Sequence, residues 1–520
     1  MDETDKDISP HYEIEPVVTR DVVSKGENSA YQPGCLQKYT SARWVLAYQV
    51  CLAYLFYMTL PHAMGFAIVC MTTRTISYNF NSSHSFNMSN INNGSLDTPE
   101  FQWDSSTQGL ILASNFFLAT LSPPIGGALC HRFGGKMVVL ITYFICAICS
   151  LFTPLAARTH LAFLITAKIV QGFCGNMIFP ATNDLWSRWT PGREKVQLVS
   201  IGFSGGTLSQ IVLFTMSGYL CTLSVDNGWP FIFYVTGGAC VVWCGMWCLT
   251  VFDSPDVHPR ISFKERQYIN NTRVGVARRH DEKIPWRAIA TSPLCYTIMV
   301  VMFAHQFTMV TFVAFTPAYM NIALKYSIPE SGVMSAVPYI GRFTASYFWG
   351  FLSDKLRTRL STTSVRKLVQ VVGFGVAGAL TGGLGYVTED TRVVAVCLLT
   401  VIMFSHSSTL SSNAQLPLDI APQFASILTG LMFGVGNLGA TVSPLITAYI
   451  IRDRTMEQWR TLFYLNMGVF LASGVAFLLF ASGDIQPWAD NTIHEERELK
   501  EKQSLKTGDD NVIEANKGDM

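Results

Sequence analysis

The sequence predicts an all-α membrane protein with about twelve transmembrane helices in two related halves. Three observations predict this class: apolar stretches of about 20 residues recur along the chain, basic residues gather in alternate loops, and one loop motif occurs in both halves. Hydrophobic residues make up 49% of the chain and charged residues only 14%, roughly half the charged share of a soluble domain. A lipid bilayer is therefore the expected surroundings of most of the chain.

The apolar stretches set the expected helices. They are placed at 44–71, 107–130, 136–156, 161–181, 196–220, 230–252, 294–320, 331–352, 366–387, 391–411, 424–451 and 461–482.

The expected organisation follows from these positions and from composition. Residues 1–42 and 483–520 are polar or highly charged and are expected as tails, and a basic central loop, 253–293, joins two six-helix halves, 43–252 and 294–482. Because the number of spans is even, both tails are expected on one side of the membrane.

Basic residues orient the chain. The loops after the second, fourth, sixth and eighth helices contain 18 lysines and arginines, whereas the opposite loops contain 7. Basic loops are retained in the cytoplasm, so both tails are expected there. Three Asn-x-Ser glycosylation sequons, at Asn81, Asn87 and Asn93, follow the first helix and agree with a lumenal or extracellular loop. A fourth, at Asn270, falls in the expected cytoplasmic loop and should be silent.

The repeated motif follows the second and eighth helices. Gly127-Ala-Leu-Cys-His-Arg-Phe-Gly-Gly-Lys136 lines up with Gly350-Phe-Leu-Ser-Asp-Lys-Leu-Arg-Thr-Arg359. In both, glycine is expected to permit a tight exit from the membrane, and the basic residues to hold the loop in the cytoplasm.

Other function classes find little support. The net charge of +1 gives no argument for a nucleic-acid partner. The thirteen cysteines lack zinc-type spacing and are interpreted as small packing residues, so neither a metal nor a cofactor is expected. Gly202-Phe-Ser-Gly-Gly206 has the form of a hydrolase motif but lies inside an expected membrane helix. An enzyme is therefore not expected.

Several longer motifs carry a family resemblance. The chain resembles the major facilitator superfamily, and within it the sodium/anion cotransporter family of type I sodium/phosphate cotransporters, sialin and vesicular glutamate transporters. The motifs are Phe179–Pro191, Pro285–Pro293, Ser335–Pro338, Leu360–Lys367, Leu418–Pro422, Ala425–Leu428 and Phe480–Asp490. This resemblance implies the major facilitator fold and an alternating-access carrier for anions, driven by sodium, protons or membrane potential.

The chain departs from the family pattern at the positions associated with anions and protons. Pro61 stands where an arginine is common in the first helix, with His62 next to it. Lys168 replaces an arginine in the fourth helix, Gly175 an acidic residue, and His305 an arginine in the seventh. Anion selectivity and coupling therefore do not follow from the resemblance alone.

Arg342 is the main candidate for substrate binding. A charge inside the bilayer costs at least about 2.5 kcal/mol on insertion scales, so it usually faces a cavity or a partner. Arg342 lies in the middle of an expected helix, too far from either end for its side chain to reach the interface. Its planar guanidinium can donate two parallel hydrogen bonds to the oxygens of a carboxylate or phosphate. The alternative is an internal ion pair or a carbonyl partner.

Lys168 is the second candidate, because it also places a charge within an expected membrane helix, 161–181. This helix belongs to the half opposite that of Arg342. Lys168 either contacts an anion or extends outward to the membrane surface. We hypothesise that Lys168 and Arg342 contact the negative groups of the substrate from opposite sides.

Further candidates are two histidines, an asparagine and three charged residues near the cytoplasmic side. His62 and His305 could couple protons or simply pack as polar residues, and Asn176 could line the path or join helices. Arg132, Asp354 and Lys355 are assigned by the resemblance to a cytoplasmic gate.

These observations predict a secondary active transporter of a small organic or inorganic anion, with co-transported sodium or protons and a lipid bilayer as its partners. The alternatives are a carrier of a non-anionic solute and a channel or receptor. The chain shows neither a carbonyl filter nor a charged ring, which disfavours a channel. The plasma membrane and an intracellular vesicle or lysosome both fit.

Overall fold

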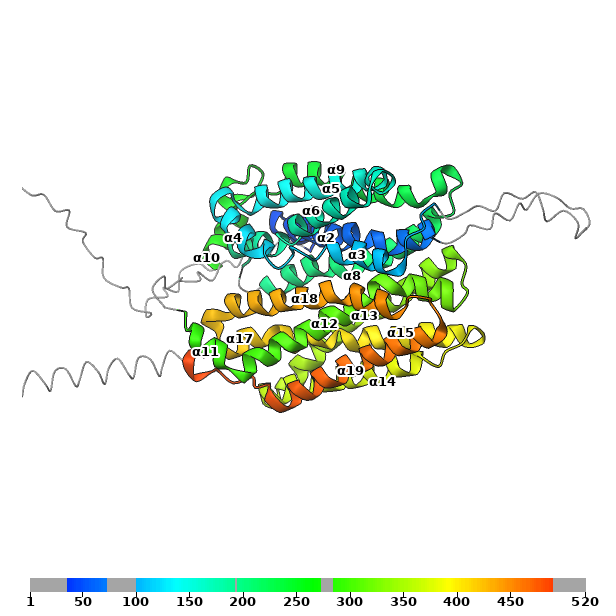
Figure 1. Cartoon of the computed structure of the whole chain (residues 1–520). Coiled ribbons are helices and arrows are strands. Elements are labelled where there is room, and N and C mark those ends of the chain that lie inside the picture. Colours follow the sequence, from blue (N-terminus) through cyan, green and yellow to red (C-terminus); the bar gives the residue numbers. More distant parts are fainter. Residues whose placement is uncertain (1–34, 73–99, 192–193, 273–283, 490–520) are drawn as a thin grey trace, which may run out of the picture.

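The computed structural model describes residues 35–72, 100–191, 194–272 and 284–489. These residues form helices, turns and short connections, and they contain no strand. Figure 1 shows the helices of the first half, blue to green, lying beside those of the second half, green to red. The sequons Asn81, Asn87 and Asn93 lie outside the described residues.

The first half begins with the short helix α1 and continues through the ends of the central loop. Its helices are α1 (Cys35–Tyr39), α2 (Ala42–Thr72), α3 (Ser105–Ser114), α4 (Ser122–Phe133), α5 (Gly135–Thr159), α6 (Leu161–Gly175), α7 (Ile178–Trp189), α8 (Lys195–Leu220), η1 (Val225–Asn227), α9 (Trp229–Thr250), η2 (Pro255–Val257) and α10 (Phe263–Thr272).

The second half differs from the first in that its second long helix, α13, is continuous. Its helices are α11 (Trp286–Thr291), α12 (Pro293–Ala318), η3 (Tyr319–Ala323), α13 (Ile328–Arg357), α14 (Thr362–Leu384), η4 (Glu389–Thr391), α15 (Arg392–His406), α16 (Ser408–Ser411), η5 (Asn413–Gln415), α17 (Leu416–Ile420), η6 (Pro422–Phe424), α18 (Ala425–Ile450), α19 (Met456–Phe480) and η7 (Pro487–Ala489).

Ten helical segments of the described residues are long and apolar enough to cross a membrane. They correspond to ten of the twelve expected spans. The expected span 107–130 is divided between α3 and α4, and 331–352 lies within α13, which contains Arg342 and a charged last turn. The all-α membrane class is confirmed, whereas the count of twelve stays a prediction.

Three expected helices are not continuous, which corrects the sequence-based assignment. The segment 107–130 is interrupted by turns at 115–121, the segment 161–181 ends at Gly175 and restarts as α7, and 391–411 is divided after His406. Apolar composition continues through the first two breaks, so hydropathy did not reveal them, whereas the break after His406 falls in a polar run at 407–412. Broken helices are tolerated inside a membrane where the freed backbone groups face protein or a cavity.

The two halves repeat the same packing. In the first half α2 packs on α8 and α5 on α9; in the second, α12 packs on α18 and α14 on α19. Between the halves, α8 packs on α13 and α3 on α18. The pairs correspond to each other by position within each half, as expected for an internal repeat.

The tightest contacts between the halves lie on the side where α2 ends. A Cβ atom on Gly332 would come within 2.6 Å of the Phe214 carbonyl oxygen and 2.8 Å of Gly218 Cα. On the same side, Arg454 donates a hydrogen bond to the side-chain oxygen of Gln108. The two halves therefore meet closely at this end of the bundle, opposite the expected cytoplasmic side.

Candidate functional site

Two small cavities lie around the helix breaks of the first half. The first is lined by residues that include Tyr57, Pro61, Asn115, Gln171 and Asn176. Asn176 caps the C-terminal end of α6, accepts a hydrogen bond from the Tyr57 hydroxyl at 3.0 Å and donates one to the Gly172 carbonyl at 2.8 Å. The predicted residue Asn176 therefore lines a cavity and also holds a helix end.

The second cavity lies between the two halves. It is lined by His62 and Asn115 from the first half and by Val310 and Ala314 of α12. The Nδ1 atom of His62 lies 2.6 Å from the Met58 carbonyl oxygen. Because a carbonyl only accepts, Nδ1 carries the proton and Nε2 is left as the acceptor of the neutral ring.

Lys168 is buried inside the first half, with 1% of its surface exposed. Its Nζ atom donates to Gln171 Oε1 at 3.0 Å and lies 5.1 Å from the centre of the Phe233 ring. Among the described residues no carboxylate pairs with it. The side chain does not extend to the membrane surface, and Gln171 connects it to the wall of the first cavity.

Arg342 is also buried, with 6% of its surface exposed, but its partner is neither an acid nor a carbonyl. Its Nη1 atom lies 2.8 Å from Nδ1 of His406, the last residue of α15. Neither cavity is lined by Arg342. The structure therefore gives Arg342 an imidazole partner, which the sequence did not suggest.

His406 belongs to a buried polar cluster with His305. Their rings stack with centroids 4.2 Å apart and planes 11° apart. Nε2 of His406 lies 3.0 Å from Thr308 Oγ1 and 3.3 Å from the His305 carbonyl oxygen. His305 Nδ1 is buried and has no hydrogen-bond partner among the described residues.

The structure brings together Arg342 and His305 through His406, but it does not bring Lys168 to Arg342. Each of these cations contacts residues of its own half. Sequence reasoning missed His406, although the signal was present, because a titratable residue within an expected span is the same criterion that selected Arg342.

The three predicted gate residues have no ion pair across the halves among the described residues. Arg132 packs on Phe133 and Lys355 on Phe351, and Asp354 is exposed. The expected tight exit at Gly127 and Gly350 is wrong, because both lie inside helices.

Gly134 makes the turn between α4 and α5 instead. Its φ is +82°, and a Cβ atom there would lie 2.6 Å from a carboxylate oxygen of Asp253.

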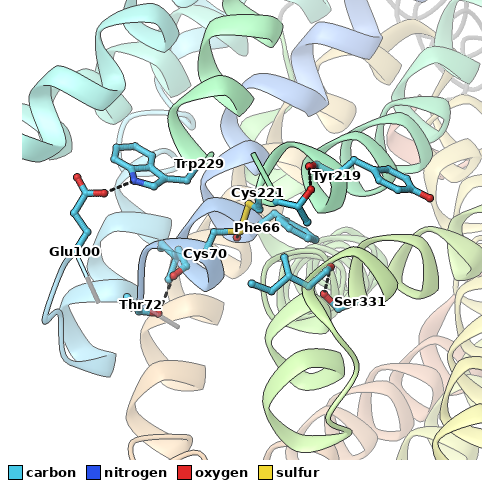
Figure 2. The surroundings of a disulfide bond; sticks show 11 residues. Phe66, Cys70, Thr72, Glu100, Tyr219, Cys221, Trp229 and Ser331 are labelled. Carbon is cyan, nitrogen blue, oxygen red and sulfur yellow. Dashed lines mark hydrogen bonds between the residues drawn. A yellow bond between two sulfur atoms is a disulfide. The ribbon is translucent and has the colours of Figure 1, made fainter. Parts of the chain in front are cut away.

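A disulfide joins Cys70 and Cys221, with Cα atoms 6.2 Å apart. Figure 2 shows it linking the end of α2 to the residue that follows α8. The interpretation of every cysteine as a packing residue is therefore wrong for these two, because their sequence separation of 151 hid the pairing.

An ion-pair network lies on the same side of the bundle. Arg158 donates to Glu100 at 2.8 Å and to Asp226 at 2.6 Å, and Trp229 Nε1 donates to Glu100 at 2.7 Å. Figure 2 shows the bond between Glu100 and Trp229. Partial burial would raise the pKa of Glu100, but its hydrogen bonds outweigh this and hold the pKa below its ordinary value of 4.5.

Comparison with known proteins assigns the architecture to a family. Residues 50–444 match the Major Facilitator Superfamily. The uncharacterized transporter slc-17.2 of Caenorhabditis elegans is 31% identical over 84% of this chain and 90% of its own length. Human sialin is 31% identical over 76% of this chain and 80% of its own. Vesicular glutamate transporter 3 of Danio rerio is 33% identical over 75% of this chain and 66% of its own length.

Solved structures share the fold at low identity. The chain superimposes on a D-xylose-proton symporter with a TM-score of 0.64 at 13% identity, covering 86% of this chain and all of that one (100%). A bacterial homologue of the human lysosomal transporter Spinster, solved inward-facing and unoccupied, gives a TM-score of 0.61 at 13% identity and covers 85% of this chain and 96% of that one. The family match covers more than half of the chain, and the curated relatives are named as transporters. The chain therefore belongs to the Major Facilitator Superfamily, in the sodium/anion cotransporter family that includes sialin and the vesicular glutamate transporters, and is a membrane transporter, not an enzyme.

Proposed function

We propose that this chain carries a small organic or inorganic anion across a membrane by alternating access, and that Lys168 and Arg342 supply the positive charge that selects it. The names of its relatives support an anion, since one of them is named as a vesicular glutamate transporter and glutamate is an anion. Over the aligned regions, human sialin is 31% identical to this chain and vesicular glutamate transporter 3 is 33% identical.

The observation that carries the proposal is the burial of two cations that have no carboxylate partner among the residues that the structure describes. Lys168 has an amide as its partner and Arg342 an imidazole, and neither partner neutralises a charge. An unpaired charge in a membrane is costly, and an anion that binds near it would offset that cost. The two cations come from opposite halves, so one anion between them would favour movement of the halves toward each other.

The polar residues of the two cavities complete the proposed path. Asn176 and His62 offer a hydrogen-bond donor or acceptor at the cavity walls, and Asn115 contributes to both walls. Arg132, Asp354 and Lys355 form the proposed cytoplasmic gate. In the structure the halves meet closely at the opposite end, so the contacts of the gate residues across the halves would form when the transporter opens toward that opposite end.

The orientation is part of the proposal. Both tails face the cytoplasm, and the end that contains Cys70 and Cys221 faces the lumen or the extracellular space. Disulfides persist in such oxidising compartments, which supports this side for Cys70 and Cys221. Removal of N-linked glycans should shift the mass of the wild-type protein, and replacing Asn81, Asn87 and Asn93 together by glutamine should abolish that shift.

The test of transport is uptake into proteoliposomes. Labelled phosphate, glutamate, sialic acid and urate are supplied in turn, with an imposed sodium, proton or electrical gradient. Saturable uptake with counterflow is expected for one of them, and Arg342→Gln and Lys168→Gln should each abolish it. Exposed cations on the expected cytoplasmic side provide matched controls, Arg359→Gln and Lys264→Gln.

Other outcomes would change the assignment. If a correctly folded protein carries none of the four anions, a carrier of a non-anionic solute is favoured, as the proline at position 61 would allow. Conduction without saturation or counterflow would favour a channel.

A further inference from the structure

We propose that His406 is the proton-binding residue that couples anion transport to a proton, through its hydrogen bond with Arg342. The inference rests on the proposed anion function and adds the identity of the co-transported ion and of the residue that binds it. Nothing in the family motifs pointed to His406.

The hydrogen bond fixes where the proton of His406 lies. A guanidinium has only donors, so Nδ1 of His406 must accept at the 2.8 Å contact with Arg342 Nη1. The imidazole is therefore neutral, and its single N–H is at Nε2. That N–H faces Thr308 Oγ1 at 3.0 Å, and the Thr308 hydroxyl in turn donates to the Ala304 carbonyl at 2.8 Å.

The surroundings of His406 do not help it to bind a second proton. From α13 it faces Arg342, and from α12 it faces the stacked ring of His305. From α14 and α19 it faces the rings of Phe374 and Phe470, which do not titrate. No carboxylate contacts it among the described residues. A proton on Nδ1 would remove the hydrogen bond and set a second positive charge beside Arg342.

An anion reverses this balance. A carboxylate or phosphate oxygen at Arg342 would accept the Nη1–H that now points at His406, and it would offset the positive charge. Nδ1 would then be free to bind a proton from water, and the imidazolium would in turn attract the anion. No bond other than these hydrogen bonds and the new N–H changes, so charge and atoms balance at one proton for each anion.

Coupling follows from reciprocity. If the anion raises the affinity of His406 for a proton, the proton raises the affinity of the site for the anion by the same factor. The two would cross the membrane together, and a gradient of one would drive the other. The stacked ring of His305 has the role of a positioning residue, which holds the plane of His406 against Arg342.

The first measurement uses purified wild-type protein in weakly buffered detergent with a pH indicator. Adding whichever of phosphate, glutamate, sialic acid or urate is transported should cause uptake of about one proton for each anion bound. Absence of proton uptake in the wild type would overturn the proposal whether or not any variant folds.

The second measurement compares His406→Gln with His131→Gln, a substitution at an exposed histidine in the last turn of α4. Glutamine can accept from Arg342 but does not titrate. In proteoliposomes with an inward proton gradient, the wild type and His131→Gln should accumulate a monoanion by about tenfold for each pH unit. His406→Gln should reach only equilibrium, and its counterflow should no longer vary with pH.

The outcomes separate this inference from the proposed function. If the wild type shows no counterflow of any anion, both fail. If His406→Gln still accumulates the anion against its gradient, the anion function stands and the role of His406 is refuted. Retained coupling in His406→Gln with loss in His305→Phe would assign the proton to His305 instead, which also overturns the proposal.

Discussion

The disulfide between Cys70 and Cys221 should make a large contribution to stability. It closes a loop with a sequence separation of 151 residues. The chain-entropy relation gives about 5 kcal/mol for a loop of this length, which is an upper limit because a membrane already restricts the unfolded chain. We take about 2 to 3 kcal/mol as the expected loss when either cysteine is replaced by serine.

This loss translates into a measurable shift in the melting temperature. The disulfide closes the first half, and for a unit of 150 to 250 residues about 1 kcal/mol corresponds to 2 to 4 °C. Cys70→Ser should therefore melt roughly 4 to 12 °C below the wild type in a detergent size-exclusion assay. Cys221→Ser and the double variant should melt at the same temperature as Cys70→Ser, because one replacement already breaks the bond.

Two controls test the reasoning. Cys397→Ser removes an exposed free thiol and should leave the melting temperature unchanged. In the unreduced wild type, Cys70 and Cys221 should resist alkylation and appear as one linked peptide by mass spectrometry. Additive losses in the double variant, or labelling of Cys70 by a maleimide without reductant, would refute the argument.

Three further predictions concern other contacts. Gly172→Ala would set a Cβ atom 1.6 Å from the Asn115 carbonyl oxygen. This variant should lose about 1 to 3 kcal/mol of stability and should also lose transport. Gly175→Ala is the control, because its Cβ atom would make only an ordinary contact at 3.8 Å, and it should be tolerated in melting and uptake assays. Asp419→Asn removes the negative charge of a largely buried ion pair with Arg366 at 2.8 Å, and the free energy of unfolding in a denaturation assay should fall by up to about 3 kcal/mol. If the stability losses of Asp419→Asn and Arg366→Gln simply add in the double variant, the pairing is contradicted. Glu100 has a pKa below 4.5 in the folded protein, so its stabilisation is complete above that value and lost as the pH falls through the folded pKa; Glu100→Gln should lower the melting temperature at neutral pH and weaken its dependence on acid, and an unchanged pH profile would oppose this.

Apolar length determined most helix positions but not their interruptions. The expected helix 44–71 is observed as Ala42–Thr72, and 196–220 as Lys195–Leu220. The expected helices 161–181 and 391–411 are broken, because a break inside a membrane requires only that neighbouring protein accept the freed backbone groups. Those neighbours come from other parts of the chain, so local hydropathy does not mark the break after Gly175, although polar residues do follow His406.

The candidate site was predicted in part for the same reason. A lone positive charge within an apolar stretch is visible in one sequence, and this was enough to select Arg342 and Lys168. The identity of a partner is not visible, because His406 lies 64 residues from Arg342 and meets it only when α15 packs on α13. The two cations are both buried, but the structure shows each with a partner in its own half.

The sequence by itself determined the membrane class, the approximate limits of the helices, the family motifs and the unusual cations, because each depends on residue type and local order. Tertiary structure alone decided which residues meet. Cys70 forms a disulfide with Cys221, and Arg342 forms a hydrogen bond with His406. Helix packing brings residues together across tens to hundreds of positions, and the energy of a buried charge depends on those neighbours more than on its own type.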